Sequence, residues 1–117
     1  MSQNIDSDRV YKLCFYVPLD HAEAVKAAVF DAGAGRIGDY HECCFQWSGT
    51  GQFRPMPGSN PYIGQQDALE RVAELKVEMI CRGDRLEAAV AALRDAHPYE
   101  EPALEAWPLT LPRLIEL

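Results

Sequence analysis

Two segments with helical periodicity, each set among strand-like segments, constrain the fold of this chain more than any other feature of its sequence. Apolar residues recur at helical spacing in residues 22–32 and again in residues 86–93. Asp20 and Asp84 each precede one of these segments, with a glutamate three residues later, which is the pattern of a capping box. The expected helices therefore run from Asp20 to a left-handed cap at Gly33, and from Gly83 to His97.

Four other segments have the composition and alternation of β-strands. The first is rich in β-branched and aromatic residues, which predicts a strand that is buried on both faces and stopped by Pro18. The third alternates apolar residues with Glu74, Lys76 and Glu78, which predicts a half-exposed strand. Pro102 weakens the fourth and favours an edge or a bulge there. The four expected strands are Val10–Val17, Tyr40–Trp47, Val72–Cys81 and Tyr99–Trp107.

The order strand, helix, strand, strand, helix, strand predicts a ferredoxin-like α+β sandwich. In this βαββαβ arrangement two helices cover one face of a four-stranded antiparallel sheet. A chain of 117 residues, 48% of them apolar, is long enough for one such core and too short for two ordinary domains. The other face of the sheet then needs a cover, which a second copy of the chain usually supplies. The architecture therefore predicts a homo-oligomer.

Three parts of different character are expected along the chain. Residues 1–9 are polar and predict a disordered N-terminal lead, residues 10–109 form the single domain, and residues 110–117 form a short C-terminal tail. Within the domain, residues 48–64, called the arm below, begin in a glycine-rich turn and contain three prolines. A loop of this length in a small domain is usually functional or an oligomer contact. We expect it to dock on a neighbouring subunit, the alternative being that it lines a ligand cleft. The arm residues in question are Gly49, Gly51, Phe53, Pro61 and Tyr62.

Charge and cysteine content exclude several classes of function. The formal net charge of −7 repels a phosphate backbone, so we expect no nucleic-acid partner. The apolar runs fall far short of the roughly 20 residues of a membrane span, and the first dozen residues do not form a signal peptide. Four cysteines without CxxC spacing predict reduced thiols and a cytoplasmic protein. They are Cys14, Cys43, Cys44 and Cys81.

Two long tracts carry a family resemblance. Residues 33–64 hold Gly33-Ala34-Gly35 and Gly49-Thr50-Gly51, and residues 93–109 hold the sequence HPYEEP at 97–102. Together they resemble the inserted domain of YqfO-type members of the Nif-three-like family, here as a stand-alone version. The HPYEEP tract is also similar to that of CutA-type divalent-cation tolerance proteins. The resemblance implies a CutA/PII-like form of the ferredoxin fold and a trimer in preference to a dimer.

The same resemblance limits what activity can be expected. Full-length members of the family are named GTP cyclohydrolase type-two homologues, and they hold two metal ions with residues of a separate core. This chain has three histidines, His21, His41 and His97, which cannot reproduce that dinuclear cluster. We therefore expect a non-enzymatic domain that binds a divalent metal or small ligand, or that serves as an interaction or regulatory module with a possible protein partner. The alternative is a metal-dependent hydrolase, disfavoured because the metal core is missing.

Two groups of side chains are candidate ligands for zinc or copper. His97, Glu100 and Glu101 combine an imidazole with two carboxylates, although His97 could instead cap the preceding helix. His41 and Cys43 lie two residues apart on one face of the expected second strand, where a core histidine and an inert thiol are the alternative.

The glycines on either side of Thr50 allow two interpretations. Backbone amides in a glycine-rich turn can bind an anion, but no phosphate-binding motif surrounds Gly49 and Gly51. We therefore expect a hairpin turn with positive φ at both glycines. Ser48 lacks the pattern of a nucleophile, so the sequence predicts no nucleophilic catalysis.

Overall fold

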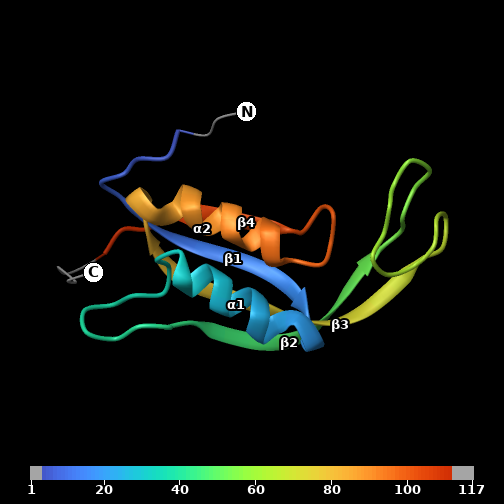
Figure 1. The fold of residues 1–117 in the computed structure, drawn as a ribbon, viewed down its shortest axis with the longest axis horizontal. Coiled ribbons are helices and arrows are strands. Elements are labelled where there is room, and N and C mark those ends of the chain that lie inside the picture. The colour runs from blue at the N-terminus through green and yellow to red at the C-terminus, as the bar shows by residue number, and fades with distance from the viewer. Residues whose placement is uncertain (1–3, 112–117) are drawn as a thin grey trace.

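A computed structural model describes residues 4–111 of the chain. The four strands form one antiparallel sheet in the order β2-β3-β1-β4, and both helices lie on the same face of it (Figure 1). This confirms the predicted α+β class with two helices over a four-stranded sheet. The elements are β1 (Val10–Pro18), the 3-10 turn η1 (Leu19–His21), α1 (Ala22–Asp31), β2 (Phe45–Phe53), β3 (Glu70–Arg82), α2 (Gly83–Ala96) and β4 (Leu104–Pro108).

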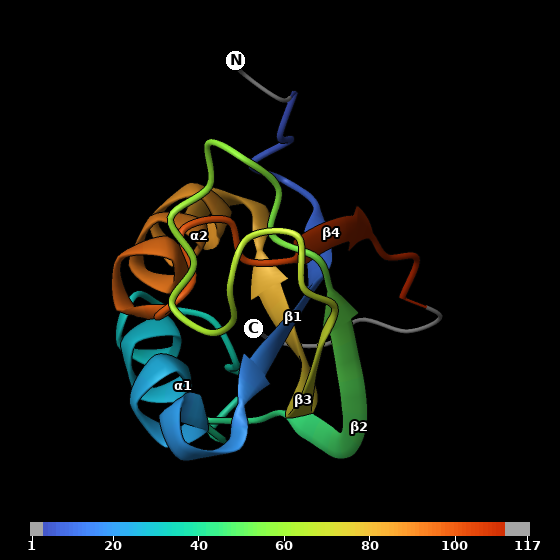
Figure 2. The ribbon, with the colours of Figure 1, turned by 90° about the vertical axis from the view of Figure 1, so that its right-hand side faces the viewer.

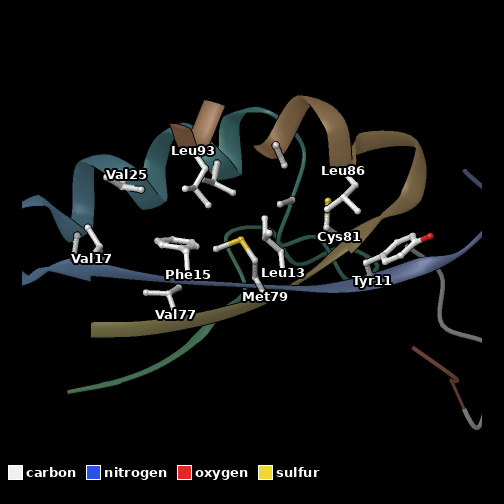
Figure 3. Close-up of a cluster of buried hydrophobic side chains, with 14 residues drawn as sticks. Tyr11, Leu13, Phe15, Val17, Val25, Val77, Met79, Cys81, Leu86 and Leu93 are labelled. Atoms are coloured by element: carbon white, nitrogen blue, oxygen red, sulfur yellow. The ribbon is translucent and has the colours of Figure 1, made fainter. Parts of the chain in front are cut away.

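The core lies between the helices and the sheet. Strand β1 occupies the middle of the sheet and pairs with β3 along its whole length, with Leu13 opposite Met79 and Phe15 opposite Val77. These four side chains point toward the helices, where Leu93 of α2 meets them (Figure 3). All five are at most 2% exposed. The predicted apolar face of the third strand is confirmed. The first strand, predicted to be buried on both faces, is fully buried on its core side, whereas Lys12 and Tyr16 on the other face are half-buried.

The second strand starts later in the chain than predicted. Residues Tyr40 to Cys44 form a loop, in which Glu42 has a positive φ of 60° and the Cys43 amide donates to the carbonyl of Gly35. A left-handed residue breaks the alternation of a strand, so the ladder begins only at Phe45. It then runs without a turn through residues 48–51 and ends at Phe53, so the first third of the predicted arm is strand and the loop itself covers residues 54–69. The expected hairpin turn is therefore wrong, and the positive φ values occur at other glycines.

The fourth strand is shorter than predicted. It spans Leu104–Pro108, whereas residues 99–103 form an irregular loop around Pro102. We call residues 97–103, between α2 and β4, the α2–β4 loop. Proline removes a donor from the ladder and restricts the residue before it, which accounts for the late start of the strand.

The helix ends follow the sequence only in part. The left-handed cap at Gly33 is confirmed, with φ of 117°. Asp20 does not cap α1, because it lies within the 3-10 turn, and its carboxylate bonds the His21 ring 3.2 Å away. Asp84 lies inside α2, and its carboxylate pairs with Arg82 instead. Both expected capping boxes are therefore wrong, although both helices form.

The chain ahead of β1 packs on the body as far as the structure describes it. Ile5 packs against the core, and the Asp6 amide donates to the Tyr11 hydroxyl at 2.9 Å. The Gly83 amide donates to the Arg9 carbonyl at 2.7 Å. Residues 4–9 thus differ from the disordered lead that was expected, while residues 1–3 and most of the predicted tail, 112–117, lie outside the described residues.

Within residues 4–111, neither helix has the length and apolar character needed to cross a membrane.

Substitution of Gly83 by alanine tests the contact between the N-terminal segment and α2. A Cβ atom there would overlap the Asp6 carbonyl oxygen and lie 2.9 Å from the Arg9 carbonyl oxygen, and backbone cannot move aside cheaply. We expect Gly83→Ala to lower the free energy of unfolding by about 1–3 kcal/mol. Gly49→Ala is the matched control, since a Cβ there meets nothing within 4 Å, and its effect should stay within about 0.5 kcal/mol. Urea denaturation followed by circular dichroism measures both, and equal effects would contradict the prediction.

Candidate functional site

A cavity of about 550 Å³ lies where the arm meets the face of the sheet opposite the helices. Its walls come from β2, from Glu74 and Lys76 of β3, from Tyr16 of β1, and from Tyr99 and its neighbours in the α2–β4 loop. Figure 1 shows why these segments meet: β2 and β3 extend past the helices, and the loop that joins them projects at that end of the molecule. All five predicted arm residues contribute to the lining: Gly49, Gly51, Phe53, Pro61 and Tyr62.

The arm is held against its own chain by polar contacts. The Asn60 amide donates to both carboxylate oxygens of Glu100, at 2.8 and 3.2 Å. The Tyr62 hydroxyl lies 3.3 Å from Nε2 of His21, and the two rings meet edge to face. Figure 2 looks onto this end of the molecule, with the arm's loop in front of the sheet. The cavity is therefore formed within one chain. Docking of the arm on a neighbouring subunit stays a prediction.

Glu74 is the buried charged group of the cavity. Its register opposite Gly49 puts it on the face away from the core, as the alternation predicts, but it is only 8% exposed instead of half-exposed. One carboxylate oxygen, Oε2, accepts a hydrogen bond of 2.8 Å from the Tyr99 hydroxyl. The other, Oε1, lies over Gly51, where any Cβ atom would overlap it. Glycine at position 51 thus leaves the space that the carboxylate occupies.

Tyr99 links this carboxylate to the α2–β4 loop. Its ring lies 5.9 Å from that of Phe53 and 4.9 Å from that of His97. Burial first, and then the hydrogen bond to Glu74, raise the pKa of the Tyr99 phenol. The phenol is therefore a stable hydrogen-bond donor to Glu74 at physiological pH.

Lys76 forms the opposite, positive side of the cavity. Its Nζ lies 5.1 Å from the Trp47 ring centroid and 5.8 Å from that of Tyr16. These three residues stand in one row across the sheet, because Lys76 pairs with Trp47 in β2 and with Tyr16 in β1. The ammonium also lies 3.7 Å from the Glu78 carboxylate. The aromatic rings and the lysine stem together make this part of the wall largely apolar.

His97 has a structural role in the geometry observed. The ring is buried, Nε2 donates to the Tyr16 carbonyl at 2.7 Å, and Nδ1 accepts from the Tyr99 amide at 3.1 Å. Both nitrogens therefore have backbone partners and neither is directed at Glu100 or Glu101. Burial lowers the pKa of the imidazole, although the hydrogen bond to Tyr16 opposes that shift, and the ring is neutral at pH 7.

The structure does not assemble either predicted metal set. Glu100 accepts from Asn60, as above, while Glu101 is exposed. His41 is exposed in the loop before β2, where Cys43 is half-buried, and neither lies on a strand. Among residues 4–111, no group of three His, Cys, Asp or Glu side chains is placed to hold a metal ion. Binding of zinc or copper stays a prediction, and this part of the chain offers no preformed site for it.

The cysteines are free thiols in the structure. Burial raises the pKa of Cys81 to about 11 and also raises that of Cys14. A thiol with a raised pKa is a poor nucleophile, because the thiolate is the reactive form. These two cysteines therefore act as packing residues of the sheet.

The sequence alone did not single out Glu74, Lys76, Tyr16 or Tyr99 as site residues. The alternation of β3 did place Glu74 and Lys76 on the same face, away from the core. What it could not supply was the sheet order, which brings Trp47 and Tyr16 to either side of Lys76. The glycine at position 51 was a usable signal, since a glycine within a strand often marks the close approach of another group.

Comparisons with known proteins show which family the chain is similar to. No family model matches the chain. It is 50% identical over 101 residues to the GTP cyclohydrolase 1 type 2 homolog of Mycobacterium leprae, and this match covers 86% of this chain and 26% of that protein. It is 48% identical over 103 residues to the protein of the same name from Halalkalibacterium halodurans, covering 88% and 28% of the two chains. A crystal structure of a Bacillus cereus protein related to NIF3 superimposes with a TM-score of 0.75 at 40% identity, covering 87% of this chain and 26% of that one. The chain is homologous to one segment of the Nif-three-like (NIF3) family proteins.

A second group of solved structures shares the fold alone. CutA from Xylella fastidiosa superimposes with a TM-score of 0.64 at 21% identity, covering 88% of this chain and 86% of CutA. The CutA-like fold inferred from the HPYEEP tract is thereby confirmed. The chain spans only about a quarter of the length of these curated relatives, so an activity of those longer proteins does not transfer to it directly.

The buried imidazole of His97 predicts a specific dependence of stability on pH. Its pKa is lowered in the folded chain, so the unfolded chain takes up a proton first as the pH falls below about 6.5, and folding stability then decreases. His97→Gln should lower the free energy of unfolding at pH 7.5 by about 1–2 kcal/mol through weakened hydrogen bonds. The variant should also lose less stability than the natural protein between pH 7.5 and pH 5.5. Urea denaturation at both pH values measures this, with His41→Gln at an exposed position as control. The same pH dependence in the His97 variant and the natural chain would contradict the assignment.

Proposed function

We propose that this NIF3-family domain is a non-catalytic binding module that self-associates through the sheet face opposite the helices. The observation that carries the proposal is an aromatic surface on that face. Phe45 and Trp47 of β2 are 70% and 42% exposed, and Trp107 of β4 is 37% exposed. Large apolar patches on a soluble chain usually mark an interface, since their exposure to water is unfavourable. A second copy of the same face would cover them.

The strand order supports the same surface. The two outer strands, β2 and β4, each have one edge without a partner among the described residues, and they carry these three aromatic residues. Unpaired strand edges favour association with another chain. CutA proteins share this fold, and the resemblance noted in the sequence favours a trimer. The exposed aromatic residues and the unpaired strand edges therefore both favour a symmetric oligomer in which the sheets of neighbouring copies contact one another.

The chemical groups that the described residues provide support a non-catalytic role. The cavity holds carboxylates, a lysine and phenols, whereas residues 4–111 contain no preformed metal set and the thiols of Cys14 and Cys81 have raised pKa values. Hydrolysis by the longer relatives would then reside in the three quarters of their length that this chain does not span. Turnover of GTP or of a phosphate monoester by the purified chain would contradict this part of the proposal.

Substitution of the aromatic surface tests self-association. The double variant Phe45→Glu/Trp47→Glu places two charges in the proposed interface, and we expect it to be a monomer at micromolar concentration while the natural chain is an oligomer. Tyr40→Glu is the matched control, because Tyr40 is 75% exposed but lies outside the sheet. Native mass spectrometry of protein purified without chelator reports the subunit count and any retained metal together. A monomeric natural chain, or an oligomer that tolerates both charges, would overturn the proposed interface.

A further inference from the structure

The cavity beneath the arm contains a charged group that self-association does not explain. Glu74 is more than nine-tenths buried, and a buried carboxylate is costly unless its oxygens are hydrogen-bonded. Tyr99 satisfies Oε2, but Oε1 has no hydrogen-bond partner among the described residues. Among the described residues, every side-chain nitrogen or oxygen that is shielded from solvent has a hydrogen-bond partner. Because Oε1 has none, it is not shielded from solvent, and we infer that it opens to the cavity that Glu74 lines.

We propose that this cavity binds a small organic cation, a primary amine on an apolar or aromatic body, with the ammonium on Oε1 of Glu74. An ammonium group supplies the hydrogen-bond donor that Oε1 lacks, and a charge-assisted bond of this kind is stronger than a neutral one. The lining comes from one chain, and Trp47 is shared between this cavity and the proposed interface.

The charges of the lining favour a cation over an anion. The carboxylates of Glu74, Glu100 and Glu101 face a single positive group in the lining, Lys76. Lys76 is itself paired with Glu78 at 3.7 Å, outside the cavity lining. A phosphate or carboxylate ligand would therefore meet net repulsion, whereas an amine would be attracted.

The apolar walls select the body of the ligand. Tyr99 bonds the carboxylate and its ring lies 5.9 Å from that of Phe53, while Trp47 and Tyr16 form the wall near Lys76. Aromatic faces contribute both apolar contact and attraction for a cation. A volume of about 550 Å³ falls in the range of sites for small organic molecules.

Gly51 shows that room for the carboxylate is built into the strand. A Cβ atom at this position would overlap Oε1, whereas one at Gly49, two residues earlier in the same strand, would meet nothing within 4 Å. The two glycines thus provide a matched pair. Alanine at position 51 should displace Glu74 from its bond to Tyr99, and alanine at position 49 should leave it in place.

Isothermal titration of the full chain with three indole probes tests the proposal. Tryptamine carries the ammonium, tryptophol is its neutral counterpart, and indole-3-acetate is an anion. We expect saturable binding of tryptamine at one site per chain, at least about tenfold weaker binding of tryptophol, and weaker binding still of indole-3-acetate. Equal binding of tryptamine and tryptophol, preference for the anion, or no binding of tryptamine would overturn the proposal.

Variants locate the binding group. Glu74→Gln keeps an acceptor for Tyr99 and removes the charge, so tryptamine affinity should fall at least about tenfold, as it should in Gly51→Ala. Gly49→Ala should bind as the natural chain does, and Lys76→Met, which removes the opposing charge, should bind more tightly. Unchanged affinity in Glu74→Gln, or weaker binding in Lys76→Met, would refute the site. The Lys76 variant and the probe series decide the matter even if Glu74→Gln does not fold. Native mass spectrometry of the same samples separates loss of the site from loss of the oligomer.

Discussion

The pairing of β1 with β3 is the interaction on which the rest of the structure depends. The two strands run antiparallel in register from Val10 opposite Arg82 to Pro18 opposite Glu74. Because side chains alternate across a strand, this register sends Leu75 and Val77 to the core and Glu74 and Lys76 to the opposite face. A slip of one residue would exchange the two sets. The same pairing thus builds the core and places both charged groups of the cavity.

Hydrophobic periodicity was enough to predict the helices and the third strand, because each buries one apolar face. The first strand was predictable from its β-branched and aromatic composition, and the order of these elements gave the α+β class. Periodicity failed for the second strand, where Glu42 adopts a positive φ that alternation does not reveal, and where the glycines at 49 and 51 are typical of a turn. In the structure those glycines are part of a ladder, since β3 is long enough to pair with both. Tertiary pairing here overrides local turn preference.

The candidate site was predictable only on its arm side. Prolines and aromatic residues marked Phe53, Pro61 and Tyr62 as functional, and all three line the cavity. Glu74 and Tyr99 are 25 residues apart in the chain, and only the folding of the α2–β4 loop over the sheet brings them together. The HPYEEP tract was informative for the family, but it could not reveal that both ring nitrogens of His97 bond backbone groups. Sequence alone does not show which polar partners a histidine will find.

The hydrogen bonds of His97 also bear on the thermodynamics of the cavity. One bond fixes the ring to β1 and the other fixes the backbone of Tyr99, while Pro98 and Pro102 restrict the φ angles of the loop on either side. The wall that carries the Tyr99 phenol is therefore ordered when the chain folds. Ordering a flexible side chain at a binding site costs about 0.5–1.5 kcal/mol, and here that entropy is lost during folding. An occupant of the cavity meets a preorganised wall, so little of its binding energy is needed to arrange the protein around it.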